Sequence, residues 1–147
     1  MFYPTDDLRN NEIYLRLEKA SEGDPQKGWV PAYHFAICLN SGEKIGLCDL
    51  RIGHNENLYY GGNIGYEVFP EHRGHHYAEK ACRLLFLLAK KHHLGYVIIT
   101  CNPDNYASAR TCEYAGGNLL EIAELPFDNN MREKGETHKR IYQFDVN

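Results

Sequence analysis

The sequence lacks the features that mark membrane-spanning and secreted proteins. None of its apolar runs reaches the length needed to cross a bilayer. The first seven residues, Met1 to Asp7, also lack the basic-then-apolar pattern of a signal peptide. We therefore expect a cytoplasmic protein with no membrane partner.

Paired cysteine motifs are missing as well. The five cysteines are odd in number and widely spaced, and no CxxC pair occurs among them. Most lie inside apolar segments, which favours buried free thiols in a reducing compartment over disulfides. These residues are Cys38, Cys48, Cys82, Cys101 and Cys112.

The chain also lacks an excess of basic residues, internal repeats and low-complexity tracts. Its net charge of -4 gives no reason to expect a nucleic-acid partner, although it is compatible with a cationic substrate such as an amine. With 147 residues, 43% of them hydrophobic, the chain has the size and apolar content of a single domain, residues 1–147.

One stretch organises the chain: a strand, a tight glycine turn, a long helix and a second strand. The run from Ile64 to Phe69 is rich in β-branched and aromatic residues, and Pro70 ends it. A wide apolar face predicts a helix over 78–92, and the apolar run 97–101 predicts a strand covered on both faces. The pattern predicts a right-handed βαβ unit with a central parallel pair of strands.

The turn and the segment after the second strand point to a ligand site. Gly74 lets the backbone approach a ligand, and the first N–H groups of the following helix form an anion site, although a glycine there can also simply make the turn. A second helix is predicted over 109–115, with Asn105 as its cap. It begins just beyond the carboxyl end of the second strand, where ligands bind in open sheets.

The remaining elements complete an α/β (α+β) domain with a mixed, mainly antiparallel sheet. Alternating apolar residues predict a first strand from Ile13, and a turn-rich tetrapeptide joins two further strands as a hairpin. The other expected elements are strands over 33–39, 44–52, 119–125 and 140–146, and loops over 21–31, 53–63 and 126–137.

Three motifs carry a resemblance to a known family. They read Val68-x-Pro70-x-x-Arg73-Gly74-x-x-Tyr77-Ala78, Asn102-x-x-Asn105-x-x-Ser108 and Glu113-x-x-Gly116. The chain resembles the GCN5-related N-acetyltransferases (GNAT family) over nearly its whole length. The resemblance implies an acyltransferase that uses acetyl-CoA as cosubstrate and acetylates an amine by direct attack. Homodimerisation is an expectation from the family, which the residues themselves do not decide.

The resemblance also implies a cofactor site. In the family, the loop at 71–76 wraps the pyrophosphate of acetyl-CoA with backbone N–H groups, and the strand before it pairs with the pantetheine amides. Two residues depart from the family pattern: Glu71 replaces a Gln or Arg, and His76 replaces a small residue. The cofactor-binding residues implied are Val68, Phe69, Pro70, Arg73, Gly74, His75, His76, Tyr77, Ala78, Asn102, Asn105 and Ser108.

Two residues are candidates for catalysis. Glu67 lies on the strand before the loop, where relatives place a general base, and its side chain points to the face opposite that of its two neighbours. Its alternative roles are to pair with a lysine, an arginine or a backbone group, or to lie near the water-exposed end of the splayed strands. His54 and His34 are the runners-up for the base. Cys112 stands where the family often has a tyrosine acid, so a thiol is the candidate acid, with a buried structural cysteine as the alternative.

Other interpretations carry less weight. His72, His75 and His76 lie on one tight loop without the spacing of metal ligands, so no metal site is expected. A dinucleotide-binding domain is disfavoured because Gly74 is not part of GxGxxG.

A non-catalytic module that senses acyl-CoA is the main alternative, since His76 and Cys112 depart from the family pattern. The acceptor, a small-molecule or peptide amine, is left open. Tyr59, Tyr60 and Tyr66 could line its cleft or simply pack in the fold.

Overall fold

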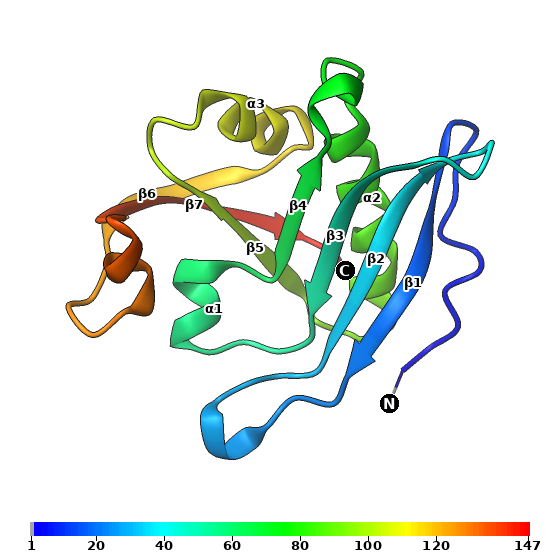
Figure 1. The fold of residues 1–147 in the computed structure, drawn as a ribbon. Coiled ribbons are helices and arrows are strands. Elements are labelled where there is room, and N and C mark those ends of the chain that lie inside the picture. Colours follow the sequence, from blue (N-terminus) through cyan, green and yellow to red (C-terminus); the bar gives the residue numbers. More distant parts are fainter. Residues whose placement is uncertain (1) are drawn as a thin grey trace.

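The computed structural model describes residues 2–147, which form two antiparallel sheets with three α-helices (Figure 1). The first sheet has the strand order β1-β2-β3-β4 and the second has the order β5-β7-β6. The strands are β1 (Ile13–Ser21), β2 (Ala32–Leu39), β3 (Lys44–Arg51), β4 (Ile64–Val68), β5 (Tyr96–Cys101), β6 (Asn118–Glu124) and β7 (His138–Asp145). The helices are α1 (Glu56–Gly61), α2 (Tyr77–Lys91) and α3 (Tyr106–Tyr114), with short 3-10 helices at Pro25–Lys27, Pro70–His72 and Asn130–Lys134.

The first sheet packs one face on α2, which lies behind β2 and β3 in Figure 1. Period-two alternation decides which residues reach that face. Leu15 of β1, Phe35 of β2 and Leu50 of β3 are buried there, against Leu85 and Leu88 of α2. All five cysteines are buried and free, as the sequence predicts.

The expected parallel pair does not appear as a ladder. Within residues 2–147, β4 and β5 are not hydrogen-bonded neighbours in either sheet. They meet just before β4, where the Asn63 N–H donates to the Ile98 carbonyl at 2.7 Å, and they diverge toward their carboxyl ends (Figure 1). The connection β4-α2-β5 therefore links two sheets.

Asn63 holds the two sheets together at this point. Its side chain is fully buried, and its Nδ2 donates to the carbonyls of Arg51 (3.1 Å) and Gly53 (2.8 Å). Its Oδ1 accepts from the Ile98 N–H at 2.8 Å. Because every polar group of this buried amide has a partner, the junction is a fixed point from which the strands separate.

Two local expectations differ from the structure. The segment 53–63, expected as a loop, contains α1, whose start is capped by Asn55 Oδ1 accepting from the Leu58 N–H at 2.9 Å. Helix α3 begins at Tyr106, three residues earlier than expected, although Asn105 caps it as predicted. No helix in the described part of the chain is long and apolar enough to span a membrane.

Candidate active site

The glycine loop has an unusual backbone. Gly74 has φ of 91°, in the left-handed region that favours glycine, and a Cβ placed on it would meet no atom within 4 Å. The space beside Gly74 is therefore open. His76 also has positive φ, 61°, which is uncommon for a residue with a side chain.

Helix α2 starts without a capping side chain. His76 occupies the N-cap position, but its side chain accepts no hydrogen bond from the first turn. The first backbone hydrogen bond of the helix runs from the Lys80 N–H to the His76 carbonyl at 3.0 Å. The N–H groups of Tyr77, Ala78 and Glu79 precede that bond and have no partner within the helix. Such a helix start can bind an anion.

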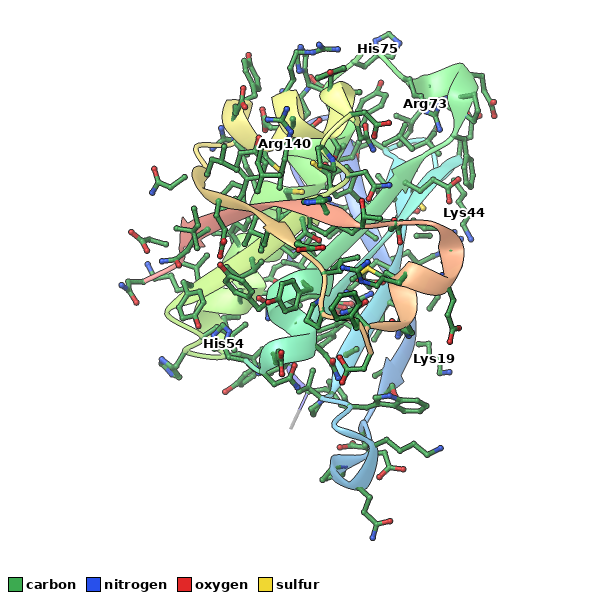
Figure 2. The ribbon with its side chains drawn as sticks, turned by 90° about the vertical axis from the view of Figure 1, so that its left-hand side faces the viewer. Lys19, Lys44, His54, Arg73, His75 and Arg140 are labelled. Carbon is green, nitrogen blue, oxygen red and sulfur yellow. The ribbon has the colours of Figure 1, made fainter. Side chains whose placement is uncertain are left out.

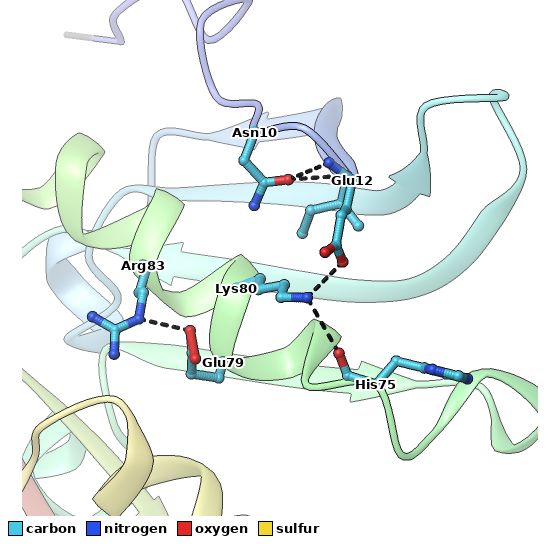
Figure 3. A network of polar contacts seen from close by, with 7 residues as sticks. Asn10, Glu12, His75, Glu79, Lys80 and Arg83 are labelled. Carbon is cyan, nitrogen blue, oxygen red and sulfur yellow. Dashed lines mark hydrogen bonds and ion pairs between the residues drawn. The ribbon is translucent and has the colours of Figure 1, made fainter.

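The three loop histidines make separate contacts. His72 pairs with Glu43 at 3.2 Å, and the His76 ring stacks on Tyr114 with centroids 4.7 Å apart. The His75 carbonyl accepts from Lys80 Nζ at 3.5 Å, and Lys80 also bonds Glu12 (Figure 3). These separate contacts hold the loop against α2, α3 and the β2-β3 turn.

Strand β4 exposes one edge toward the gap between the sheets. Arg51 N–H donates to the Asn63 carbonyl at 2.7 Å, and Phe69 N–H donates to the Ile45 carbonyl at 2.9 Å, so the odd-numbered residues turn their polar groups toward β3. In an antiparallel ladder the alternate residues face the other way. The backbone groups of Tyr66 and Val68 therefore point to the open edge, where an extended chain with amide groups can pair.

Arg73 occupies part of that edge. Its Nε donates to the Val68 carbonyl at 2.9 Å, so the loop folds back over the end of β4. Figure 2 shows Arg73 and His75 together at one end of the molecule. An arm bound along β4 would compete with Arg73 for this carbonyl, while the terminal nitrogens of the guanidinium suit a phosphate.

Glu67 lies on the sheet face opposite α2. The side chains of Tyr66 and Val68 point toward the core, whereas Glu67 is exposed and stands opposite Leu47 of β3. None of the hydrogen bonds or ion pairs found among residues 2–147 involves its carboxylate. The side chain is free to accept a proton from a group approaching this face.

Three polar side chains at or just before the start of α3 make hydrogen bonds. Asn105 Oδ1 caps the helix by accepting from the Ser108 N–H at 3.2 Å. Asn102 Oδ1 accepts from Lys139 Nζ at 2.8 Å, and the buried Lys139 also bonds Glu136 at 2.9 Å. Ser108 Oγ lies 2.6 Å from Tyr66 Oη, which joins α3 to β4 across the gap.

Cys112 lies behind this hydroxyl pair. Its side chain is fully buried, and burial is the main cause that raises the pKa of its thiol to about 12. A thiol with a raised pKa keeps its proton at neutral pH, and the acid role of Cys112 stays a prediction. The Tyr66 phenol lies beside this thiol, and burial raises the pKa of the phenol too.

A cavity of about 650 Å³ opens on the same side of the sheet as Glu67. Between the two lies an ionic group on β2 and β3, in which Asp49 stands 3.6 Å from Arg51 and 4.0 Å from His34. Asp49 also accepts from the Gly65 N–H at 3.0 Å, two residues before Glu67. The cavity is lined by Ser21, Gly23, Gly28, Trp29, Val30, Ala32, His34, Arg51, Asn55, Asn57, Leu58, Gly61, Asp128, Asn129, Asn130 and Met131.

The two histidines considered as alternative bases have other surroundings. His54 stacks on Tyr96 with centroids 4.0 Å apart and lies at the opposite end of the molecule from Arg73 and His75 (Figure 2). His34 lines the cavity beside Asp49. Only His34 therefore shares a face with Glu67.

Sequence patterns did not reveal Asp49, Lys139 or the partnership of Tyr66 with Ser108. A charged residue inside a β-strand was the available signal for Asp49 and Lys139, since such residues are seldom buried without partners. The Tyr66–Ser108 contact joins residues 42 positions apart, and no local periodicity predicts it.

The fold and this arrangement define a class: an α+β protein with an uncapped helix start beside an open strand edge. Comparison with known proteins identifies the class. The family described as Acetyltransferase (GNAT) domain matches residues 1–118, and a search of curated proteins gives no match. The chain therefore belongs to the GNAT acetyltransferase family.

Solved structures share the fold at low sequence identity. A GNAT-family acetyltransferase from Bacillus anthracis is 21% identical, with a TM-score of 0.61 over 77% of this chain and 66% of that one. A Microcin C7 self-immunity acetyltransferase in complex with acetyl-CoA and AMP is 20% identical, with a TM-score of 0.61 over 78% of this chain and 61% of that one. A proposed ribosomal-protein-serine acetyltransferase from Vibrio cholerae is 17% identical, with a TM-score of 0.68 over 97% and 99%.

Proposed function

We propose that this GNAT acetyltransferase transfers the acetyl group of acetyl-CoA to a primary amine by direct attack, without a covalent enzyme intermediate. One observation carries the proposal. The uncapped start of α2 and the unpaired edge of β4 adjoin each other, with the exposed Glu67 on that strand. An anion site that continues into a row of backbone amides suits a cofactor with a pyrophosphate and a two-amide arm.

The phosphates are assigned to the loop. The first N–H groups of α2 have no capping side chain, the space beside Gly74 is open, and Arg73 adds a guanidinium. The pantetheine arm is assigned to the β4 edge around Val68, Phe69 and Pro70. Of these, the Phe69 N–H already bonds Ile45, so the amide contacts fall to Val68 and, one step further, Tyr66.

The second motif flanks the arm from the other side. Asn105 has its oxygen engaged as the cap of α3, which leaves its Nδ2 for the cofactor. The side-chain oxygen of Asn102 accepts a hydrogen bond from Lys139. Asn102 therefore helps to orient the end of β5 next to the cofactor.

Glu67 is assigned as the general base. An amine must be neutral to attack a thioester, and an exposed carboxylate without a partner can take its proton directly or through water. The acceptor approaches from the face that carries the cavity and Asp49. A small-molecule amine and a peptide amino terminus both fit this description, and the relatives' names include a ribosomal-protein acetyltransferase.

A cytoplasmic location and a homodimer complete the proposal. The exposed Leu119, Leu120 and Ile122 lie on β6, an edge strand of its sheet. Sedimentation of the purified protein tests the oligomeric state, and a monomer at high concentration would contradict the dimer.

Calorimetric titration with acetyl-CoA, CoA and NADH is the first test. We expect micromolar binding of both CoA forms and none of NADH, followed by thiol release with at least one member of a panel of small amines and peptides. Binding without turnover by any amine would favour the alternative, a non-catalytic sensor of acyl-CoA. Absence of CoA binding would refute the proposal.

Replacing the base separates catalysis from binding. Glu67→Gln should lower kcat by about 100-fold while leaving CoA affinity unchanged. Glu18→Gln is the matched control, because Glu18 is an exposed carboxylate of the same sheet that pairs with Lys44. Equal loss of turnover and CoA affinity in Glu67→Gln would count against its role as a base.

A further inference from the structure

Tyr66 reaches across the gap between β4 and α3. Its ring packs against the main core, and its Oη lies 2.6 Å from Ser108 Oγ in the first turn of α3. The contact is side chain to side chain, so either oxygen can be the donor. The buried thiols of Cys101 and Cys112 adjoin this pair, Cys101 beside Ser108 and Cys112 beside Tyr66.

The position of the pair relative to β4 gives it a role. The backbone of Tyr66 faces the open edge, and the anion-binding start of α2 lies beyond the other end of the strand. A cofactor arm that begins at α2 and pairs with this edge runs back from Val68 toward Tyr66. Its terminal sulfur then arrives between β4 and α3, where the two hydroxyls meet.

We propose that Tyr66 is a catalytic residue that donates a hydrogen bond from its phenol to the sulfur of the departing CoA thiolate, and that Ser108 positions it. This inference rests on the proposed function. In this arrangement the Ser108 hydroxyl donates to Tyr66 Oη, which leaves the phenol proton for the sulfur. A hydroxyl that accepts one hydrogen bond donates a second one more strongly.

Donation without proton transfer follows from the relative acidities. Burial raises the pKa of the Tyr66 phenol above its usual value near 10, whereas an ordinary thiol has a pKa of about 8.5. Transfer of the proton from the phenol to the thiolate is therefore uphill. The C–N bond forms and the C–S bond breaks, the electron pair stays on sulfur, and the amine proton goes to Glu67. The hydrogen-bonded thiolate takes its proton from water after it leaves.

The proposal can be tested on CoA binding alone, without an acceptor. A hydrogen bond to the thiolate lowers the pKa of the bound CoA thiol, so CoA should bind more tightly as pH rises past that pKa, until the free thiol is ionised. Desulfo-CoA carries the same phosphates but no thiol, and the ratio of the two affinities isolates the sulfur. We would measure this ratio by calorimetry from pH 6 to pH 10.

For the unmodified protein the affinity ratio should rise in favour of CoA by about tenfold across this range, the effect of one hydrogen bond to a charged group. In Tyr66→Phe the ratio should stay flat, and Ser108→Ala should give an intermediate rise. Tyr14→Phe, on β1 and outside the gap, is the control and should behave as the unmodified protein.

Each outcome decides one point. An undiminished rise in Tyr66→Phe would overturn the proposal, as would a flat ratio in the unmodified protein. If Tyr66→Phe fails to fold, Ser108→Ala keeps the Tyr66 ring in place, and an undiminished rise there would refute the positioning role. Failure of the unmodified protein to bind either CoA or desulfo-CoA would instead refute the proposed function.

Discussion

Helices α2 and α3 begin at the same end of the molecule, but their N-termini are capped differently (Figure 1). Helix α3 starts at Asn105, whose side chain accepts from the Ser108 N–H. Helix α2 starts at His76, whose side chain accepts nothing from the first turn and whose backbone is left-handed. At the start of α3 a side chain accepts one of the free N–H groups, whereas at the start of α2 no side chain does so.

This difference shows where the fold gives up stability for binding. A capping side chain is worth about 1 kcal/mol, and a residue with positive φ costs a similar amount. In α2 both effects fall on His76: its side chain makes no cap, and its backbone has positive φ. A bound anion would supply the missing hydrogen bonds, so the protein should be more stable when CoA is present.

The largest expected effect comes from closing the open loop. Gly74→Val places a β-branched side chain at φ of 91° and fills the space where the phosphates are assigned. We expect CoA affinity to fall at least about 100-fold, measured by calorimetry, because the loop must change its conformation to relieve the strain.

Gly135→Val is the matched control for that loss. Gly135 has φ of 86° and nothing within 4 Å of an added Cβ, but it ends the 3-10 helix Asn130–Lys134, away from the loop. It should carry the same backbone strain and keep CoA affinity. Equal affinity in both variants would refute the assignment of the phosphates to the Gly74 loop.

A smaller effect should follow from placing a carboxylate at the start of α2. His76→Asp cannot act as an ordinary cap, because caps need extended backbone and this residue has φ of 61°. The charge would repel the phosphates, so we expect about a tenfold loss of CoA affinity with no gain in stability. His76→Asn, without the charge, should lose less, and identical losses would argue against a phosphate near this residue.

The reverse experiment removes the cap of α3. Asn105→Ala should lower the free energy of unfolding by about 1 kcal/mol in urea denaturation, because the Ser108 N–H loses its acceptor. Asn105→Asp keeps an acceptor oxygen and should retain stability. If Asn105→Asp nevertheless binds CoA more weakly, its Nδ2 contacts the cofactor; unchanged stability in Asn105→Ala would show that the cap contributes little.

The organising stretch could be predicted because its signals are local. Pro70, Gly74 and the apolar face of the long helix each act on their own neighbours, and both ends of β4, α2 and β5 lie within one residue of the expected bounds. Helix α1 was missed because six residues with two tyrosines and a glycine give no clear helical period.

The separation of the sheets could not be predicted from strand patterns. It depends on the buried Asn63, which fills the junction between strands and satisfies its amide there. The same limit applies at the site. Glu67 was found because alternation isolates it, whereas the burial of Cys112 behind Tyr66 depends on contacts between distant segments.

The other end of α2 provides the smallest expected effect. His92, the C-cap residue, places its Nε2 2.6 Å from Tyr33 Oη, and burial lowers the pKa of its imidazole below the usual 6.5. The unfolded chain therefore binds a proton more readily than the folded one, so stability is present above about pH 6.5 and is lost as pH falls toward the lowered pKa.

Urea denaturation at pH 7.5 and 5.5 should show this loss of stability. The loss should be smaller in His92→Gln and unchanged in His138→Gln, which alters an exposed site. An identical pH dependence in His92→Gln would mean that other groups destabilise the acid form. The helix would then be open at its start for a ligand but not held by a neutral histidine at its end.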